Sequence, residues 1–200
     1  MKPYSFSALL SRMKYITRWG LMRSTRAETL AEHSAETAQL AHLLALLANG
    51  QFGADVRPDA VTVAALYHDA AEILTGDLPT PVKYSGEALK NAYKALEQQA
   101  SARICALAPQ PVQAPLLEAM TGSGLTAREK SILKAADKLS GLIKCMEEKQ
   151  SGNLEFERAA RAQLKALEEM HLPEVDWFMQ QMLPAYKLTL DELTAGAPQT

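Results

Sequence analysis

Apolar residues recur at helical spacing along almost the whole chain. The first such stretch, Ser5 to Ile16, carries them at relative positions i, i+3, i+4, i+7 and i+10, which form one stripe on a helix. We find no hairpin signature, internal repeat or long linker between these stretches. The pattern therefore predicts a single all-α domain. The expected helices cover about 5–16, 29–49, 58–73, 86–107, 111–120, 127–149, 153–170 and 174–186.

Local signals mark several helix ends. Thr29 and Glu32 fit a capping box, and Gly50 is the expected C-cap of the helix that begins there. Pro58 suits the first turn of the next helix, because an N–H at that position would have no helical partner. Two prolines and a glycine predict a loop over residues 75–81.

Composition narrows the class of protein without choosing a function. The 200 residues are 48% hydrophobic and 22% charged, and the net charge of −2 argues against a nucleic-acid coat protein. Cys105 and Cys145 are too few for a disulfide scaffold and fit a reducing cytoplasm. The most apolar run, 43–48, is far shorter than the roughly 20 residues that cross a membrane. Arg12 and Lys14 interrupt the apolar N-terminal segment, so we expect no secretory signal and no membrane partner.

The first candidate for chemistry is the group His68, Asp69 and Glu72. On a helix His68 and Glu72 share a face, because positions i and i+4 are about 40° apart. Ionisable groups are costly to bury on a mostly apolar helix, and metal coordination would offset that cost. The alternative is a solvated His-Asp pair at an exposed helix end.

His33 and Asp137 strengthen the metal interpretation. His33 lies in the first turn of a long predicted helix, and Asp137 interrupts an apolar helical face, although it could instead pair with neighbouring lysines. Two histidines and two carboxylates suit one divalent transition metal. His42 is nine positions after His33 and therefore faces the other side of the helix, and His171 precedes a helix-breaking proline. We expect a core or surface role for His42 and a structural role for His171.

This set of residues, together with several short motifs, resembles a known family. The order His, His-Asp, Asp in a helical chain is similar to that of the HD-domain metal-dependent phosphohydrolases. The resemblance is closest to the bacterial 5′-deoxynucleotidases of that superfamily, and it covers nearly the whole chain. It rests on RW at 18–19, AEHS at 31–34, YHDAAE at 67–72, TGDLPTPVKY at 75–84 and KAAD at 134–137.

The resemblance implies a fold and an activity. The fold would be a single HD-domain helical bundle, with a metal core at about 28–150, substrate residues from segment 1–27 and C-terminal helices at about 153–187. The activity would be hydrolysis of deoxyribonucleoside 5′-monophosphates to deoxynucleosides and phosphate by a cytoplasmic homodimer. The alternatives are a phosphohydrolase of cyclic or polyphosphate nucleotides, and a non-catalytic nucleotide-binding module. The complete set of candidate ligands favours an enzyme.

The same resemblance assigns roles to residues at the metal. His33, His68, Asp69 and Asp137 would hold one divalent cation, such as cobalt, manganese or another transition metal. The cation would lower the pKa of a bound water and neutralise phosphate charge. Glu72 would accept the proton of that water as general base, its alternative being a surface carboxylate.

The substrate contacts also follow from the resemblance. Arg18 would orient the phosphate, and Trp19 would form a wall beside the sugar, whereas a tryptophan is more often a core anchor. Asp69 and Asp137, which lie at the metal, would also touch the substrate. The nucleoside would lie against Asp77, Leu78, Pro79 and Thr80.

Overall fold

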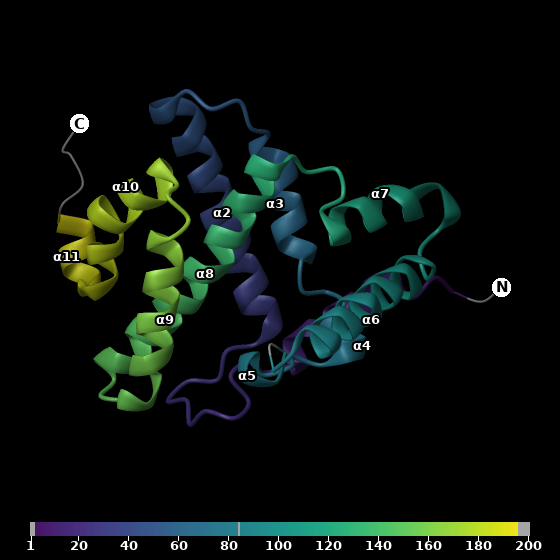
Figure 1. Cartoon of the computed structure of the whole chain (residues 1–200), viewed down its shortest axis with the longest axis horizontal. Helices are drawn as coiled ribbons and strands as arrows, with labels where there is room; N and C mark the ends of the chain where they lie inside the picture. Colours follow the sequence, from purple (N-terminus) through teal and green to yellow (C-terminus); the bar gives the residue numbers. More distant parts are fainter. Residues whose placement is uncertain (1–2, 84, 196–200) are drawn as a thin grey trace.

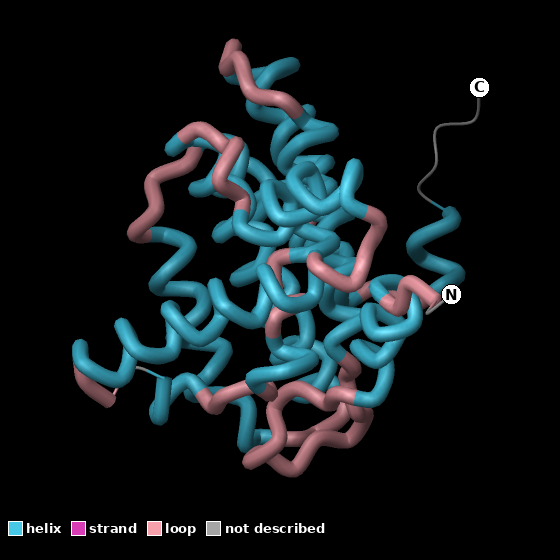
Figure 2. The backbone as a smooth tube through the Cα atoms, turned by 90° about the vertical axis from the view of Figure 1, so that its right-hand side faces the viewer, coloured by secondary structure: helices cyan, strands magenta, loops and turns pink. Residues whose placement is uncertain are grey.

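A computed structural model describes residues 3–83 and 85–195, and this part of the chain is helical with no strand (Figures 1 and 2). The expectation of an all-α protein is confirmed. Within the same residues, no helix is long and apolar enough to cross a bilayer. The α-helices are α1 (Phe6–Leu10), α2 (Leu30–Phe52), α3 (Pro58–Tyr67), α4 (Glu72–Thr75), α5 (Thr80–Lys83), α6 (Glu87–Cys105), α7 (Gln110–Thr121), α8 (Ala127–Gln150), α9 (Glu157–Glu168), α10 (Pro173–Gln181) and α11 (Leu190–Ala195), and the 3-10 helices are η1 (Ser11–Tyr15), η2 (Leu154–Phe156) and η3 (Leu183–Lys187).

Helices α2 and α8 lie at the centre of the molecule, with α9 to α11 on one side and α4 to α7 on the other (Figure 1). The larger apolar core joins α2, α3, α8, α9 and α10 through side chains such as Leu44, Val61, Leu139 and Phe178. A smaller cluster, which includes Leu30, connects η1 and the first turn of α2 to α6 and α7. The first turns of α2 are therefore fixed between two packed regions.

The predicted start of α2 is confirmed, and its predicted end is wrong. The backbone N–H of Thr29 donates to Glu32 Oε2 (2.7 Å), and the Glu32 N–H donates to Thr29 Oγ1 (3.2 Å), which completes the capping box. The helix continues through Gly50 and stops at Gly53, whose φ of +64° is the left-handed conformation that closes a helix. Pro58 is the first residue of α3, as expected.

The predicted helix 58–73 is interrupted. α3 ends at Tyr67, and the next four residues form a turn in which the N–H of Ala70 donates to the Tyr67 carbonyl (2.9 Å). The N–H of Glu72 donates to the Asp69 carbonyl (2.9 Å) at the start of α4. Every residue here is compatible with a helix, so periodicity gave no sign of the break. The argument that His68 and Glu72 share one helical face is therefore wrong.

Other boundaries differ in smaller ways. The predicted helix 5–16 is divided into α1 and η1, and the short helices α4 and α5 occupy both ends of the predicted loop 75–81, so that residues 76–79 remain as loop. α11 lies beyond the predicted C-terminal helices. Cys105 and Cys145 are both free and buried, which agrees with the absence of a disulfide scaffold.

A loop between η1 and α2 carries Arg18 and Trp19, and backbone hydrogen bonds close its base. The N–H of Leu30 donates to the Ile16 carbonyl (2.8 Å), and the N–H of Arg18 donates to the Glu28 carbonyl (2.9 Å). Trp19 has a φ of +63°, a left-handed conformation that is uncommon for a bulky residue. Contacts elsewhere must hold this conformation in place.

Glu148 of α8 anchors the far part of this loop. Its carboxylate accepts hydrogen bonds from the N–H (2.8 Å) and Oγ1 (2.8 Å) of Thr25, from Asn153 Nδ2 (2.8 Å) and from Lys144 Nζ. Glu148 and Lys144 are almost completely buried. Burial alone would raise the pKa of Glu148, but the hydrogen bonds from Lys144 and Thr25 stabilise the ionised carboxylate and hold its pKa well below the usual value.

Candidate active site

Four side chains from three parts of the fold converge on one point. His33 comes from the first turn of α2, His68 and Asp69 come from the turn after α3, and Asp137 comes from α8. Asp69 Oδ2 lies 3.1 Å from His68 Nε2 and 3.6 Å from His33 Nε2. Asp137 Oδ1 lies 3.2 Å from His33 Nε2 and 4.0 Å from His68 Nε2. We call these four residues the His-Asp cluster.

The hydrogen bonds of the two imidazoles leave both Nε2 atoms available for a metal. His68 Nδ1 is 2.7 Å from the Ala65 carbonyl, which can only accept, so the ring proton is on Nδ1. His68 Nε2 is buried and has no hydrogen-bond partner among the described residues. His33 Nδ1 is likewise occupied, by Ser140 Oγ at 2.9 Å. A metal-ligating histidine typically holds its second ring N–H in this way.

The spacing of the ligand atoms also fits a transition metal. Ligand distances of about 2.0–2.1 Å place neighbouring donors about 3 Å apart and opposite donors about 4 Å apart. The four distances between histidine nitrogens and aspartate oxygens, from 3.1 to 4.0 Å, span this range. His33, His68 and Asp69 bring one ligand atom each within 4.8 Å of one another, and Asp137 adjoins this group through its contacts with the two histidines. Asp137 is partly exposed, and its ion pairs within the described residues are with His33 and His68 rather than with lysines.

Charges within the cluster favour the ionised carboxylates. Burial alone would raise the pKa of Asp69, but His68 and His33 hold it well below the usual value. Burial likewise opposes the charge of Asp137, and a hydrogen bond with His33 lowers its pKa. The same attraction overcomes burial and raises the pKa of His68 to about 9. The site therefore attracts a positive charge, and a cation would compete with the proton for it.

Glu72 is the first residue of α4, and it is close enough to the His-Asp cluster to be repelled by the charge of Asp69. Its side chain is buried, and Oε2 has no hydrogen-bond partner among the described residues. Burial, together with repulsion from Asp69 and Asp77, raises the pKa of Glu72 to about 9. Despite the break after Tyr67, Glu72 thus remains beside the cluster with an oxygen available for a proton.

Glu28 connects the two residues of the RW motif. Its Oε2 accepts a hydrogen bond from Arg18 Nη1 (2.7 Å) and another from Trp19 Nε1 (2.9 Å). The Trp19 ring also packs against Phe156, with centroids 5.3 Å apart. Burial works against the charge of Arg18, but Glu28 and the carboxylates of the cluster raise its pKa. The guanidinium therefore remains charged close to the site.

The loop after α4 forms another side of the site. Asp77, Leu78 and Pro79 are partly buried, and the side chain of Thr80 lies outside the described part of the structure. Burial raises the pKa of Asp77, whereas the charge of Arg18 lowers it. Asp77 is therefore within electrostatic range of Arg18.

Two residues of α6 support this loop. Tyr93 donates its hydroxyl hydrogen to the Gly76 carbonyl (2.9 Å), and the ammonium group of Lys83 lies over the Tyr93 ring. Lys83 also pairs with Glu97 at 2.8 Å. The loop is thereby tied to α6 at both of its ends.

Several of these supporting residues had not been expected from the sequence. Glu28, Ser140 and Glu36, which accepts a hydrogen bond from Ser140 Oγ (2.6 Å), lack a local motif. For Glu28 a signal existed, because a tryptophan N–H that is buried usually finds an acceptor. His42 and His171 are exposed and lie outside the cluster, as expected.

Known proteins match the chain over almost its whole length. A family model described as 5′-deoxynucleotidase YfbR-like matches residues 5–186. A 5′-deoxynucleotidase of Cronobacter sakazakii is 43% identical over 201 residues, which are 99% of this chain and 100% of that protein. The 5′-deoxynucleotidase YfbR of Escherichia coli O1:K1 is also 43% identical, over 202 residues and with the same coverage.

Solved structures show the same fold. An HD-domain phosphohydrolase from Listeria innocua aligns with a TM-score of 0.80 at 24% identity, covering 96% of this chain and 95% of its own. Another match is the cyanophage S-2L HD phosphohydrolase DatZ, whose structure contains dA and one catalytic Zn²⁺. It aligns with a TM-score of 0.62 at 23% identity, covering 92% of this chain and 97% of its own. With the helical fold that it shares with HD-domain phosphohydrolases and the full-length matches taken together, the chain belongs to the YfbR-like 5′-deoxynucleotidase family.

Proposed function

We propose that the His-Asp cluster holds one divalent cation with which this 5′-deoxynucleotidase hydrolyses deoxyribonucleoside 5′-monophosphates to deoxynucleosides and phosphate. The observation that carries the proposal is the convergence of two imidazole Nε2 atoms, each on a ring whose Nδ1 is held by a protein partner, on two carboxylates. The family name and the dA and Zn²⁺ bound by DatZ support it. Zinc, cobalt and manganese are all compatible with such a ligand set.

Glu72 is the base in this proposal. When bound, the cation would lower the pKa of a coordinated water and neutralise phosphate charge. Glu72 would take a proton from the attacking water at Oε2, the buried oxygen that has no protein partner among the described residues. Its raised pKa makes it a strong proton acceptor, and positive charge beside Asp69 would offset the repulsion that otherwise keeps it protonated.

Arg18 and Trp19 would bind opposite ends of the ribose phosphate. The charged Arg18 guanidinium would orient the phosphate, with Asp69 and Asp137 beside it. Trp19 would form the wall beside the sugar, and Glu28 and Phe156 hold its indole from two sides. A 2′-hydroxyl would lose its water against this wall without gaining a partner. The loop Asp77–Thr80 would hold the nucleoside from the other side.

We also expect an arrangement within one domain, a homodimer and a cytoplasmic location. Segment 1–27 would supply the substrate residues to a metal core at about 28–150. The resemblance to bacterial 5′-deoxynucleotidases motivates the dimer, which light scattering on the purified protein tests. Two free, buried cysteines fit a reducing compartment.

A comparison of Glu72→Gln with the unmodified protein tests the function. We expect phosphate release from dAMP with cobalt, manganese or zinc, and its loss with a chelator. Glu72→Gln should retain the cation but lose roughly two to four orders of magnitude in kcat, the usual contribution of a general base. Glu168→Gln, an exposed change on α9, is the matched control. Faster hydrolysis of cyclic or triphosphate nucleotides than of dAMP would contradict the proposed substrate.

A further inference from the structure

Two polar side chains behind His33 form a hydrogen-bonded chain that leads away from the His-Asp cluster. His33 Nδ1 is 2.9 Å from Ser140 Oγ, and Ser140 Oγ is 2.6 Å from Glu36 Oε2. His33 and Ser140 have no exposed surface. Glu36 is one turn after His33 on α2, and Ser140 is one turn after Asp137 on α8.

The directions of these hydrogen bonds are fixed by the number of hydrogens available. Burial raises the pKa of Glu36, and the hydrogen bond with Ser140 works against that rise. The ionised carboxylate can only accept, so Ser140 donates its one hydroxyl hydrogen to Glu36. Ser140 Oγ must therefore accept at its contact with His33, so that Nδ1 is the nitrogen that carries the ring proton. Thr37 Oγ1 lies 3.5 Å from both ring nitrogens and does not distinguish between them. The lone pair of His33 is consequently on Nε2, which faces Asp69 and Asp137.

We propose that Glu36, acting through Ser140, is a positioning residue that fixes the tautomer and orientation of His33 and thereby sets the affinity of the site for its cation. The inference rests on the proposed function, since it takes His33 as a ligand of that cation. Its new content is the assignment of a role to Glu36 and Ser140. Partners of this kind typically change metal affinity by about 10–100-fold when they are removed.

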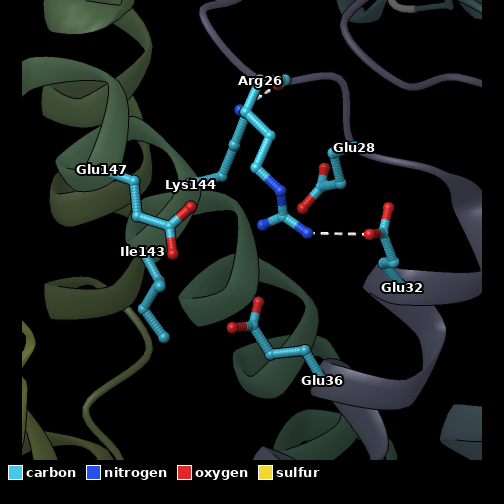
Figure 3. Close-up of a pocket in the computed structure, with 7 residues that line it drawn as sticks. All are labelled: Arg26, Glu28, Glu32, Glu36, Ile143, Lys144 and Glu147. Carbon is cyan, nitrogen blue, oxygen red and sulfur yellow. Dashed lines mark hydrogen bonds and ion pairs between the residues drawn. The ribbon is translucent and has the colours of Figure 1, made fainter. Parts of the chain in front are cut away.

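The surroundings of Glu36 separate this role from a structural ion pair. Glu36 reaches into a cavity of about 170 Å³ together with Arg26, Glu28, Glu32, Ile143, Lys144 and Glu147 (Figure 3). Arg26 is paired with Glu32 at 2.7 Å, and Lys144 is paired with Glu148. Within residues 3–83 and 85–195, Ser140 is the hydrogen-bond partner of the Glu36 side chain, and no cation forms an ion pair with it. A change at Glu36 therefore breaks no ion pair among these residues, and the side-chain hydrogen bond that it affects is the one that leads to His33.

Glu147 offers a matched control for Glu36. It lines the same cavity from α8, and its side chain makes no hydrogen bond or ion pair within the described residues (Figure 3). Glu147→Gln thus changes the charge of the cavity by the same amount as Glu36→Gln. Of these two changes, only Glu36→Gln affects the hydrogen-bonded chain that leads to His33.

The test measures the affinity of the metal-free full chain for Co²⁺ and Zn²⁺ by competition with a chromophoric chelator. We expect Ser140→Ala to weaken binding by about 10–100-fold. Glu36→Gln should weaken it by a smaller factor, and Glu147→Gln should leave it unchanged. Because the two residues act in series, the double variant Glu36→Gln/Ser140→Ala should bind no more weakly than Ser140→Ala alone.

Histidine ring NMR of the metal-free protein gives a readout that a purely structural role would not move. The proton on His33 Nδ1 should be observed in the unmodified protein, and its signal should be lost or exchange rapidly in Ser140→Ala. Circular dichroism and the Tm check that each variant is folded. If Ser140→Ala does not fold, Glu36→Gln and its control still decide the question, because that change keeps the shape of the side chain.

The outcomes distinguish this inference from the proposed function. If His33→Ala binds the cation as tightly as the unmodified protein, His33 is not a ligand and the proposed function fails. If His33→Ala loses the cation but Ser140→Ala and Glu36→Gln retain full affinity, the positioning role alone is refuted. Equal weakening by Glu36→Gln and Glu147→Gln would also refute it, because the effect would then come from cavity charge.

Discussion

The attachment of the loop between η1 and α2 to α8 leads to a prediction about stability. Glu148 is almost fully buried and accepts hydrogen bonds from Thr25, Asn153 and Lys144. Glu148→Gln keeps the volume of the side chain but leaves the Lys144 ammonium group buried without its counter-charge. Removal of one partner of a buried ion pair costs about 3–5 kcal/mol. Since a domain of this kind has a free energy of unfolding of about 5–15 kcal/mol, the variant should lose a large fraction of its stability.

The ion-pair contribution can be separated from the other hydrogen bonds. Lys144→Met removes the unpaired charge, while Gln at position 148 can still accept a bond from Thr25 through its carbonyl oxygen. The double variant Lys144→Met/Glu148→Gln should therefore be more stable than the sum of the two single changes predicts, by about 1–3 kcal/mol. Lys144 also donates to the Arg26 carbonyl (2.6 Å), so Lys144→Met alone measures the loss of that bond.

Urea unfolding followed by circular dichroism provides the measurement. Chelator should be present throughout, because a bound cation would stabilise the folded state and mask the differences. A loss below about 1 kcal/mol in Glu148→Gln would refute the reasoning, as would a double variant that is simply additive. In the folded variant, a raised KM for dAMP would show that the loop carrying Arg18 and Trp19 has been released from α8.

Three further predictions concern the cation, the sugar and acid stability. Asp137→Ala should lose bound metal yet keep its helical circular dichroism, and full metal occupancy in the purified variant would exclude Asp137 as a ligand. Trp19→Ala should reduce the preference for dAMP over AMP in kcat/KM, mainly by raising the AMP rate. An apolar wall alone rejects a hydroxyl by about a hundredfold, which sets the scale of the expected change. An unchanged ratio would assign the selectivity to another residue. The hydrogen bond from Arg57 is the main reason that the pKa of Glu129 falls to about 2 from an ordinary value of 4.5. The stabilisation from this carboxylate is complete above pH 4.5 and is lost as the pH falls towards 2, so Glu129→Gln should flatten the pH dependence of unfolding in that window, and an unchanged slope would contradict the prediction.

The helical fold and the convergence of the candidate metal ligands could be predicted from the sequence for different reasons. Apolar spacing and capping residues such as Thr29 act locally, so short windows of sequence contain their effect. Histidines and buried acids are few, which makes a convergent set easy to recognise once the helices are placed. Glu72 lies within electrostatic reach of Asp69 although α3, the helix expected to position it, ends at Tyr67.

The remaining features depend on contacts that no local pattern encodes. The break after Tyr67 occurs in a stretch that is compatible with a helix throughout. The left-handed backbone of Trp19 depends on Glu28 and Phe156, which hold its side chain from outside the motif. Ser140 is 107 positions from His33, and nothing near either residue indicates that they meet.

That long separation has a consequence for the order of events as the protein is made. His33, His68 and Asp69 emerge from the ribosome well before α8, which carries Asp137 and Ser140. Closing so long a segment of chain costs entropy, which is recovered only when α2 and α8 pack together. A nascent chain that ends before α8 would therefore contain three of the four residues of the His-Asp cluster but bind a cation only weakly. If the His-Asp cluster holds the cation, we therefore expect metal loading to be a late step in biogenesis that waits for α8 to dock.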